Sequence, residues 1–228
     1  MTTKKPQIES LDQMAEETAA ALVQAAGNAA FRLFKDKQFR HLARFAQLGQ
    51  TEQDRIFNEL VVGAVVLIML VLEAPDLRVA EEFRGYLADM KKKISQAHIN
   101  YLKTLGVAAK HLKIWKKLIA MRYKEYARDR HDVRAAAMQI ESEEKRLELD
   151  DLAKIQMLVP VQAVAIGCHY FICRGQTDGR DDLFKLTLNS LSEFYVELRS
   201  RFEGAPITPL KRLGVKLQRT LHRLRKRK

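Results

Sequence analysis

The stretch LVVGAVVLIMLVL, residues 60–72, contains no polar side chain and is bracketed by Glu59 and Glu73. As a helix that rises about 1.5 Å per residue, it would span roughly 20 Å, less than the roughly 30 Å of a membrane's hydrocarbon core. A helix that is apolar all round is typical of one whose neighbours cover every face. We therefore predict that Leu60–Leu72 is a buried helix inside a bundle.

A second apolar run, Ile155–Cys173, keeps a membrane interpretation open. It is long enough to span a bilayer, and together with Leu60–Leu72 it would form a membrane-inserted hairpin. It also contains Gln156, Gln162 and His169, however, and polar groups are costly in lipid. A buried core is the favoured interpretation of both runs, and membrane insertion is the alternative.

Helix signals fill nearly all of the remaining chain. Ser10 and Gln13 have the spacing of a capping box and predict a helix that Gly49 ends. Gly27 and Asn28 form a candidate break within it.

The longest predicted helix follows Pro75, with Asp76 as its N-cap. Apolar or small residues then recur in alternating steps of three and four, a coiled-coil heptad pattern that only His98 interrupts. The stripe consists of Phe83, Leu87, Met90, Ile94, Tyr101, Leu105, Ala108, Leu112, Trp115 and Ile119. We predict one long central helix here, a break within Glu125–Asp132, and a further helix that Pro160 ends or kinks.

The cleanest helical pattern lies further along the chain, after a loop at residues 175–179. Its apolar residues recur in steps of four and three: Phe184, Leu188, Leu191, Tyr195, Leu198 and Phe202. Gly204 follows as the C-cap. No stretch shows the alternation of a strand. We therefore predict an all-α bundle of about six helices over residues 1–204, followed by a linker and a basic amphipathic helix over residues 205–228.

The net charge of +12 is concentrated in two segments. From Arg199 onward the chain has eleven Lys or Arg and one acid, and Lys91–Lys124 contains ten basic residues and no acid. Each segment carries a local charge of +10, so the remainder of the chain is acidic. Basic segments of this kind are typical of proteins that bind polyanions.

The C-terminal segment predicts an amphipathic helix after Pro209. On a helical wheel its leucines fall within about 80°; they are Leu210, Leu213, Leu217, Leu221 and Leu224. Its basic residues, the first candidate site, are Lys211, Arg212, Lys216, Arg219, Arg223, Arg225, Lys226, Arg227 and Lys228. Three interpretations stay open: a helix in an anionic membrane interface, a helix docked on the bundle that offers its charges to phosphates, and a solvated terminal helix.

The second candidate site is a row of lysines in the central basic segment. One lysine recurs every seven residues, and two more widen the row; the members are Lys103, Lys110, Lys117 and Lys124, with Lys113 and Lys116 beside them. Such a row suits a phosphate backbone, but it is also typical of a solvated face. A third interpretation is neutralisation by acids of the following helix: Glu141, Glu143, Glu144, Glu148, Asp150 and Asp151. Tyr101 and Trp115 belong to the heptad stripe, which favours core packing over stacking on bases.

No motif predicts catalysis, a metal or a cofactor. The six histidines lack the Glu-x-x-His and His-Glu-x-x-His spacings, and neither a glycine-rich phosphate loop nor a nucleophile elbow occurs. Cys168 and Cys173 would lie apart around a helix, so we expect free thiols and a reducing compartment. We accordingly expect no enzyme, no cofactor and no small-molecule substrate.

Together these features predict a non-catalytic helical protein that binds a polyanionic partner through basic helices, with sequence-independent nucleic-acid binding slightly favoured. One alternative is a membrane-associated protein that uses the C-terminal helix and Leu60–Leu72. The other is a protein-interaction or assembly subunit, a homo-oligomer paired through its heptad stripes. The expected location is the cytoplasm, peripheral at a membrane in the first alternative.

Overall fold

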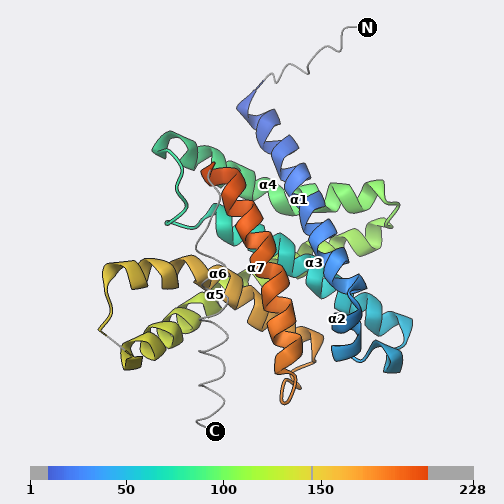
Figure 1. Cartoon of the computed structure of the whole chain (residues 1–228). Coiled ribbons are helices and arrows are strands. Elements are labelled where there is room, and N and C mark those ends of the chain that lie inside the picture. Colours follow the sequence, from blue (N-terminus) through green and yellow to red (C-terminus); the bar gives the residue numbers. More distant parts are fainter. Residues whose placement is uncertain (1–9, 145, 205–228) are drawn as a thin grey trace, which may run out of the picture.

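The computed structural model describes residues 10–144 and 146–204, which are helical and contain no strand (Figure 1). The all-α prediction is thus confirmed for this part of the chain. Seven α-helices are present in these ranges: α1 (Leu11–Lys35), α2 (Lys37–Leu42), α3 (Gln50–Leu72), α4 (Arg84–Thr104), α5 (Ala109–Glu144), α6 (Leu149–Ile172) and α7 (Asp181–Glu203). Two short 3₁₀ helices accompany them: η1 (Phe45–Gln47) and η2 (Glu81–Phe83). The predicted linker and basic C-terminal helix, residues 205–228, lie outside the described residues.

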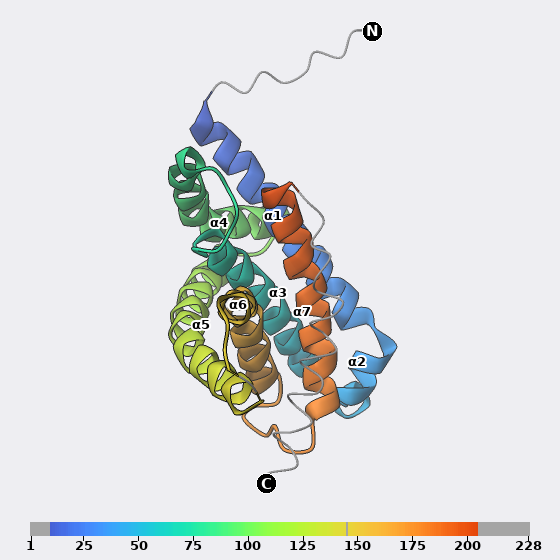
Figure 2. The same ribbon diagram turned by 60° about the vertical axis from the view of Figure 1, so that its left-hand side comes forward.

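The α3 helix lies at the centre and contacts α1, α4, α5, α6 and α7. Figure 2 shows it between α5 and α6 on one side and α1 and α7 on the other. Every residue from Leu60 to Leu72 is buried except Met69, which is half-buried. A helix surrounded in this way has no face on which a polar side chain reaches water, which explains the composition of the stretch.

The α3 and α6 helices are each long and apolar enough to cross a membrane, judged by length and composition alone. The most apolar windows of the two helices are 78% and 67% buried inside the fold, respectively. Because the core helix of a soluble protein has the same properties, the two helices are weak evidence for a membrane.

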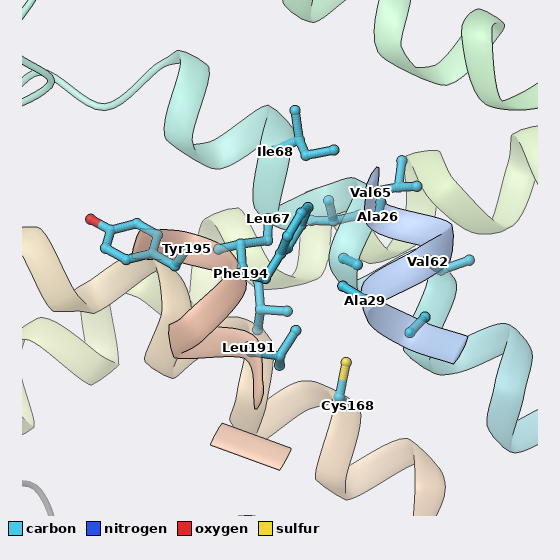
Figure 3. Packing of buried hydrophobic residues seen from close by; sticks show 14 of the residues in the cluster. Ala26, Ala29, Val62, Val65, Leu67, Ile68, Cys168, Leu191, Phe194 and Tyr195 are labelled. Carbon is cyan, nitrogen blue, oxygen red and sulfur yellow. The ribbon is translucent and has the colours of Figure 1, made fainter. Parts of the chain in front are cut away.

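The apolar stripe of α7 faces the core of its own chain. In Figure 3, Leu191 and Phe194 of α7 and Leu67 of α3 extend toward one another, and all three are buried. Leu188, Tyr195 and Leu198 of the predicted stripe are buried as well, while its end members Phe184 and Phe202 are half-buried. Gly204 follows α7 in the left-handed conformation with a φ of 67°, as the C-cap prediction required.

The predicted single long helix over Phe83–Ile119 is wrong, because the chain turns between α4 and α5. Gly106 adopts a left-handed backbone with a φ of 80° just after α4 ends at Thr104. The backbone N–H groups of Gly106 and Val107 donate to carbonyls in the last turn of α4, as in other helices that end on glycine. The heptad stripe is therefore divided between two helices that pack on each other.

The predicted break within Glu125–Asp132 is also wrong, since α5 continues through it to Glu144. The stretch contains no Gly or Pro, so nothing in its backbone opposes a helix. The long helix of the described chain is thus α5, and it is peripheral, with three buried residues: Ile119, Arg122 and Tyr126. The next helix, α6, passes through Pro160 instead of ending there.

The candidate break in α1 is not used either, because α1 continues through Gly27 and Asn28 to Lys35. Asp36 ends it, since its carboxylate accepts a hydrogen bond from the backbone N–H of Phe39 at 2.8 Å and caps α2. The first predicted helix therefore corresponds to α1, α2 and η1 together.

Two glycines let α6 approach its neighbours closely. A Cβ atom on Gly63 of α3 would overlap the sulfur of Cys168, and one on Gly167 of α6 would overlap the ring of Tyr126. We expect Gly167→Ala to lower the free energy of unfolding by about 1–3 kcal/mol, because a buried ring has to shift to admit the methyl group. Chemical denaturation followed by circular dichroism measures this effect.

Gly85→Ala is the matched control, because Gly85 is an exposed residue of α4 with no neighbouring atom within 4 Å of a Cβ atom. Alanine is the better helix former by up to about 1 kcal/mol, so this variant should be at least as stable as the wild type. Equal denaturation midpoints for the two alanine variants would contradict the close packing at Gly167.

Candidate polyanion-binding surface

The exposed side of α5 carries most of the predicted lysine row. Four of its lysines fall within an arc of about 60° around the helix at about 100° per residue, and the row is about 21 Å long. These residues, hereafter the lysine face, are all exposed: Lys110, Lys113, Lys117 and Lys124. Lys116 lies beside them on α5, whereas Lys103 belongs to the last turn of α4 and does not continue the row. The buried residues of α5, Ile119, Arg122 and Tyr126, point the other way, into the fold, and this orients the lysines outward.

The structure divides the ten basic residues of Lys91–Lys124 into two groups. Four of them form ion pairs within the described chain: Lys91, Lys92, Lys93 and Arg122. The other six, which are the lysine face, Lys103 and Lys116, form no ion pair with any described residue. Their charge is therefore balanced by solvent ions, which a polyanion displaces on binding.

Of the three interpretations of this row, neutralisation by the acids of a following helix is not the one that the structure supports. The first three of the proposed acids lie on α5 itself, and Glu141, the nearest of them, is about 25 Å from Lys124 along the helix axis. Glu148 and Asp151 form the capping box of α6, which begins after α5 has ended. The uninterrupted α5 thus separates a basic first half from an acidic end.

Exposed aliphatic side chains flank the lysine face. Ile114 is 62% exposed and Met121 is 43% exposed, and at 100° per residue both lie directly beside the lysines. Leu105, at the corner before α5, is also exposed. Isolated exposed aliphatic residues are common, but lysines and aliphatics on one helical face are what interfacial helices present to anionic lipid.

The aromatic residues of this region pack inward. Tyr101 and Trp115 are half-buried, and the Trp115 ring lies 5.2 Å from the ring of buried His98. Trp115 therefore packs between α4 and α5, while Tyr101 lies close to Gly27 of α1. Neither ring belongs to the lysine face, which offers no aromatic platform for bases.

Glu59, which the sequence marks only as the end of the apolar stretch, forms a buried ion pair. Arg122 of α5 donates from Nη2 and Nε to the two carboxylate oxygens of Glu59 at 2.7 and 3.0 Å. The guanidinium carbon lies 3.3 Å from the ring centre of Phe171. Burial opposes the charge, but Glu59 raises the pKa of Arg122 above its ordinary value. Each of the two buried side chains neutralises the charge of the other, so the pair has a structural role.

Cys168 lies next to this pair and is chemically inert. Its thiol donates to the backbone carbonyl of Glu59 at 3.7 Å, and burial raises the pKa of Cys168 to about 12. The thiolate that nucleophilic catalysis requires is therefore absent at neutral pH. Cys168 and Cys173 are both free, as their spacing predicted, and both are buried.

Glu73, at the other end of the apolar stretch, accepts two hydrogen bonds and forms an ion pair with Arg130. Lys91 and Tyr123 donate to one of its oxygens, the latter at 2.7 Å, and Arg130 lies 2.8 Å from the other oxygen. Partial burial acts to raise the pKa of Glu73, but the hydrogen bonds from Lys91 and Tyr123 hold it below its usual value. This cluster joins the end of α3 to α4 and α5.

Among the described residues, no group of three or more His, Cys, Asp or Glu side chains is placed to hold a metal ion. The other predicted site, Lys211 to Lys228, lies outside the described residues. Comparison with protein families, curated proteins and solved structures found no match to the chain. The lysine face is the candidate site on its geometry alone.

Proposed function

We propose that the protein is a non-catalytic polyanion-binding protein and that the lysine face of α5 contacts the polyanion. One observation supports this most strongly: the four exposed lysines of this face form no ion pair with any described residue, and no acid precedes Glu125 on α5. Lysines cost little on a solvated surface, but phosphates that displace their counterions gain free energy from every neutralised charge.

Nucleic acid, bound without sequence preference, is the first candidate partner. A straight row of charges about 21 Å long follows a phosphate backbone, and base-specific contacts are not needed. The basic residues of the C-terminal segment would add a second electrostatic contact.

An anionic membrane surface is the second candidate partner, supported by Ile114 and Met121. Both are exposed beside the lysines, and aliphatic side chains gain free energy on entering the lipid interface. Phosphates of nucleic acid offer no such gain, so the aliphatic pair distinguishes the two partners.

Replacing the four residues of the lysine face by glutamine should weaken binding to a DNA duplex about tenfold or more at roughly 100 mM salt. Each phosphate contact contributes about 0.9 to the slope of log affinity against log salt, so the slope should fall by up to about 3.6. Fluorescence anisotropy with a labelled duplex at several salt concentrations measures both quantities. A charge-matched control replaces four exposed lysines elsewhere by glutamine: Lys35, Lys37, Lys92 and Lys154.

Equal loss in the two quadruple variants would show a general charge effect and would contradict a specific surface. The double variant Ile114→Gln/Met121→Gln then separates the partners. It should leave DNA binding unchanged, whereas loss of sedimentation with anionic vesicles would assign the face to a membrane.

A further inference from the structure

A pocket of about 970 Å³ lies at the end of the molecule where α2 meets the start of α7. Both ribbon views show these two elements side by side (Figures 1 and 2). Its walls come from α2, η1, α3 and the chain around Gly179. Neither α4 nor α5 contributes, so the pocket is separate from the lysine face.

Three arginines line this pocket: Arg40 and Arg44, four residues apart in the sequence, and the distant Arg180. None of them forms an ion pair with a described residue, whereas Arg55, Arg122 and Arg199, for example, each pair with a carboxylate. The one acid in the lining, Asp182, forms an ion pair with Lys185 at 3.0 Å. The pocket therefore concentrates positive charge that the described protein does not balance.

Two of the arginines are held in place by uncharged partners. The Arg40 guanidinium lies 4.5 Å from the ring centre of Phe45 and 5.7 Å from that of Phe34. Arg180 donates from Nη2 to the backbone carbonyl of Leu42 at 3.1 Å. A guanidinium fixed in this way loses little further freedom on binding and keeps unused N–H donors for a ligand.

Arg44 has a backbone conformation that is unfavourable for an arginine. Its φ is 59° and its ψ is 38°, in the left-handed region where a side chain costs free energy and glycine does not. Arg174 is the second non-glycine residue of the described chain with a positive φ, and it pairs with Glu52. Arg44 has no such ion-pair partner. Its strained backbone places a charged side chain at the pocket, and strained residues are frequent at functional sites.

We infer that this pocket binds a small phosphate monoester that carries a ring, such as a nucleoside monophosphate. Three guanidiniums suit a dianionic group, and their paired N–H donors match phosphate oxygens. Half-buried Leu48 offers the ring an apolar contact, backed by the buried side chains of Phe45 and Leu183. The volume is in the range of pockets that bind small molecules, and the pocket is partly open to solvent. The sequence predicted no small-molecule ligand, because Arg180 joins Arg40 and Arg44 only in the fold.

Titration calorimetry of the full chain with AMP tests this inference, with adenosine and glycerol 3-phosphate as partial ligands. AMP should bind about tenfold more tightly than either, since each lacks one of its two parts. Arg40→Gln and Arg44→Gly should each weaken AMP binding about tenfold. Arg44→Gly should melt at or above the wild-type temperature, since glycine relieves the left-handed strain, so its loss of binding cannot be ascribed to unfolding.

The control variant Arg128→Gln/Arg201→Gln removes two exposed arginines elsewhere and should leave AMP binding unchanged. The quadruple glutamine variant of the lysine face should bind AMP as the wild type does. Loss of binding in that variant, equal affinity for AMP and glycerol 3-phosphate, or full binding by Arg44→Gly would each overturn the inference.

Discussion

Glu59→Gln is expected to lower the free energy of unfolding by about 3–5 kcal/mol, the usual effect of removing one partner from a buried ion pair. Glutamine keeps the size and hydrogen-bonding shape of the carboxylate but removes its charge. The Arg122 guanidinium would then stay buried between α3 and α5, 6% exposed, with no buried countercharge. Urea denaturation at neutral pH measures the loss.

The double variant Glu59→Met/Arg122→Leu distinguishes the effect of the two charges from the effect of the space that the two side chains fill. Removing both charges leaves no unpaired buried group, and apolar residues of similar volume replace such pairs at little or no cost in stability. We therefore expect the double variant to be more stable than Glu59→Gln, close to the wild type. A double variant as unstable as the single one would show that shape rather than charge determines stability here.

Glu125→Gln is the matched control. Glu125 accepts from the same guanidinium at 2.9 Å, but its side chain is 31% exposed. Water replaces such a partner readily, so the loss should stay below about 1 kcal/mol. A loss equal to that of Glu59→Gln would contradict the difference in burial on which the prediction rests.

The burial of the apolar stretch could be predicted from its composition alone, but the roles of the two glutamates at its ends could not. An apolar helix needs neighbours on every side, so the burial of Leu60–Leu72 follows from its residues. In the sequence, Glu59 and Glu73 mark only the two ends of this stretch. In the structure they are paired with Arg122 and Arg130, which lie on a helix far along the chain. Pairing across such a distance has no local signal in a sequence.

Helix ends were misplaced where apolar periodicity was weighed above backbone chemistry. The heptad stripe continues in phase across Gly106, but a left-handed glycine ends a helix whatever its neighbours favour. Charge in residues 125–132 suggested a break, although Glu and Arg are good helix formers and the stretch contains no Gly or Pro. At α7, where periodicity and the glycine cap agree, the prediction is confirmed.

The candidate site, too, could be predicted from the sequence only in part. The lysine spacing predicted one helical face, and the structure places four of the lysines on it. Whether acids neutralise that face depends on where α5 ends, which is a matter of tertiary structure. The arginine pocket had no signal in the sequence, since Arg40 and Arg180 are close only because α2 packs against α7.

His98→Leu is expected to make the protein less sensitive to acid, because His98 of α4 is buried beside Trp115. Neither of its ring nitrogens has a hydrogen-bond partner in the described chain, and burial lowers its pKa from 6.5 to about 4. Between these values the unfolded chain binds a proton that the folded protein does not, so acid favours unfolding. The histidine should therefore cost about 3 kcal/mol of stability between neutral pH and pH 4, and leucine should remove that loss.

The variant His98→Gln distinguishes the effect of protonation from the cost of burying a polar side chain. Glutamine does not titrate but remains polar, so it should remove the acid sensitivity without the gain of about 1–3 kcal/mol that leucine should bring at neutral pH. Because the other titrating groups are common to all three proteins, the difference between their stability curves isolates residue 98. Urea denaturation from pH 4 to 8 gives these curves, and the NMR titration of the His98 ring protons gives the pKa directly. A ring that titrates near pH 6.5, or curves that stay parallel for the three proteins, would place His98 in contact with water and contradict its burial between α4 and α5.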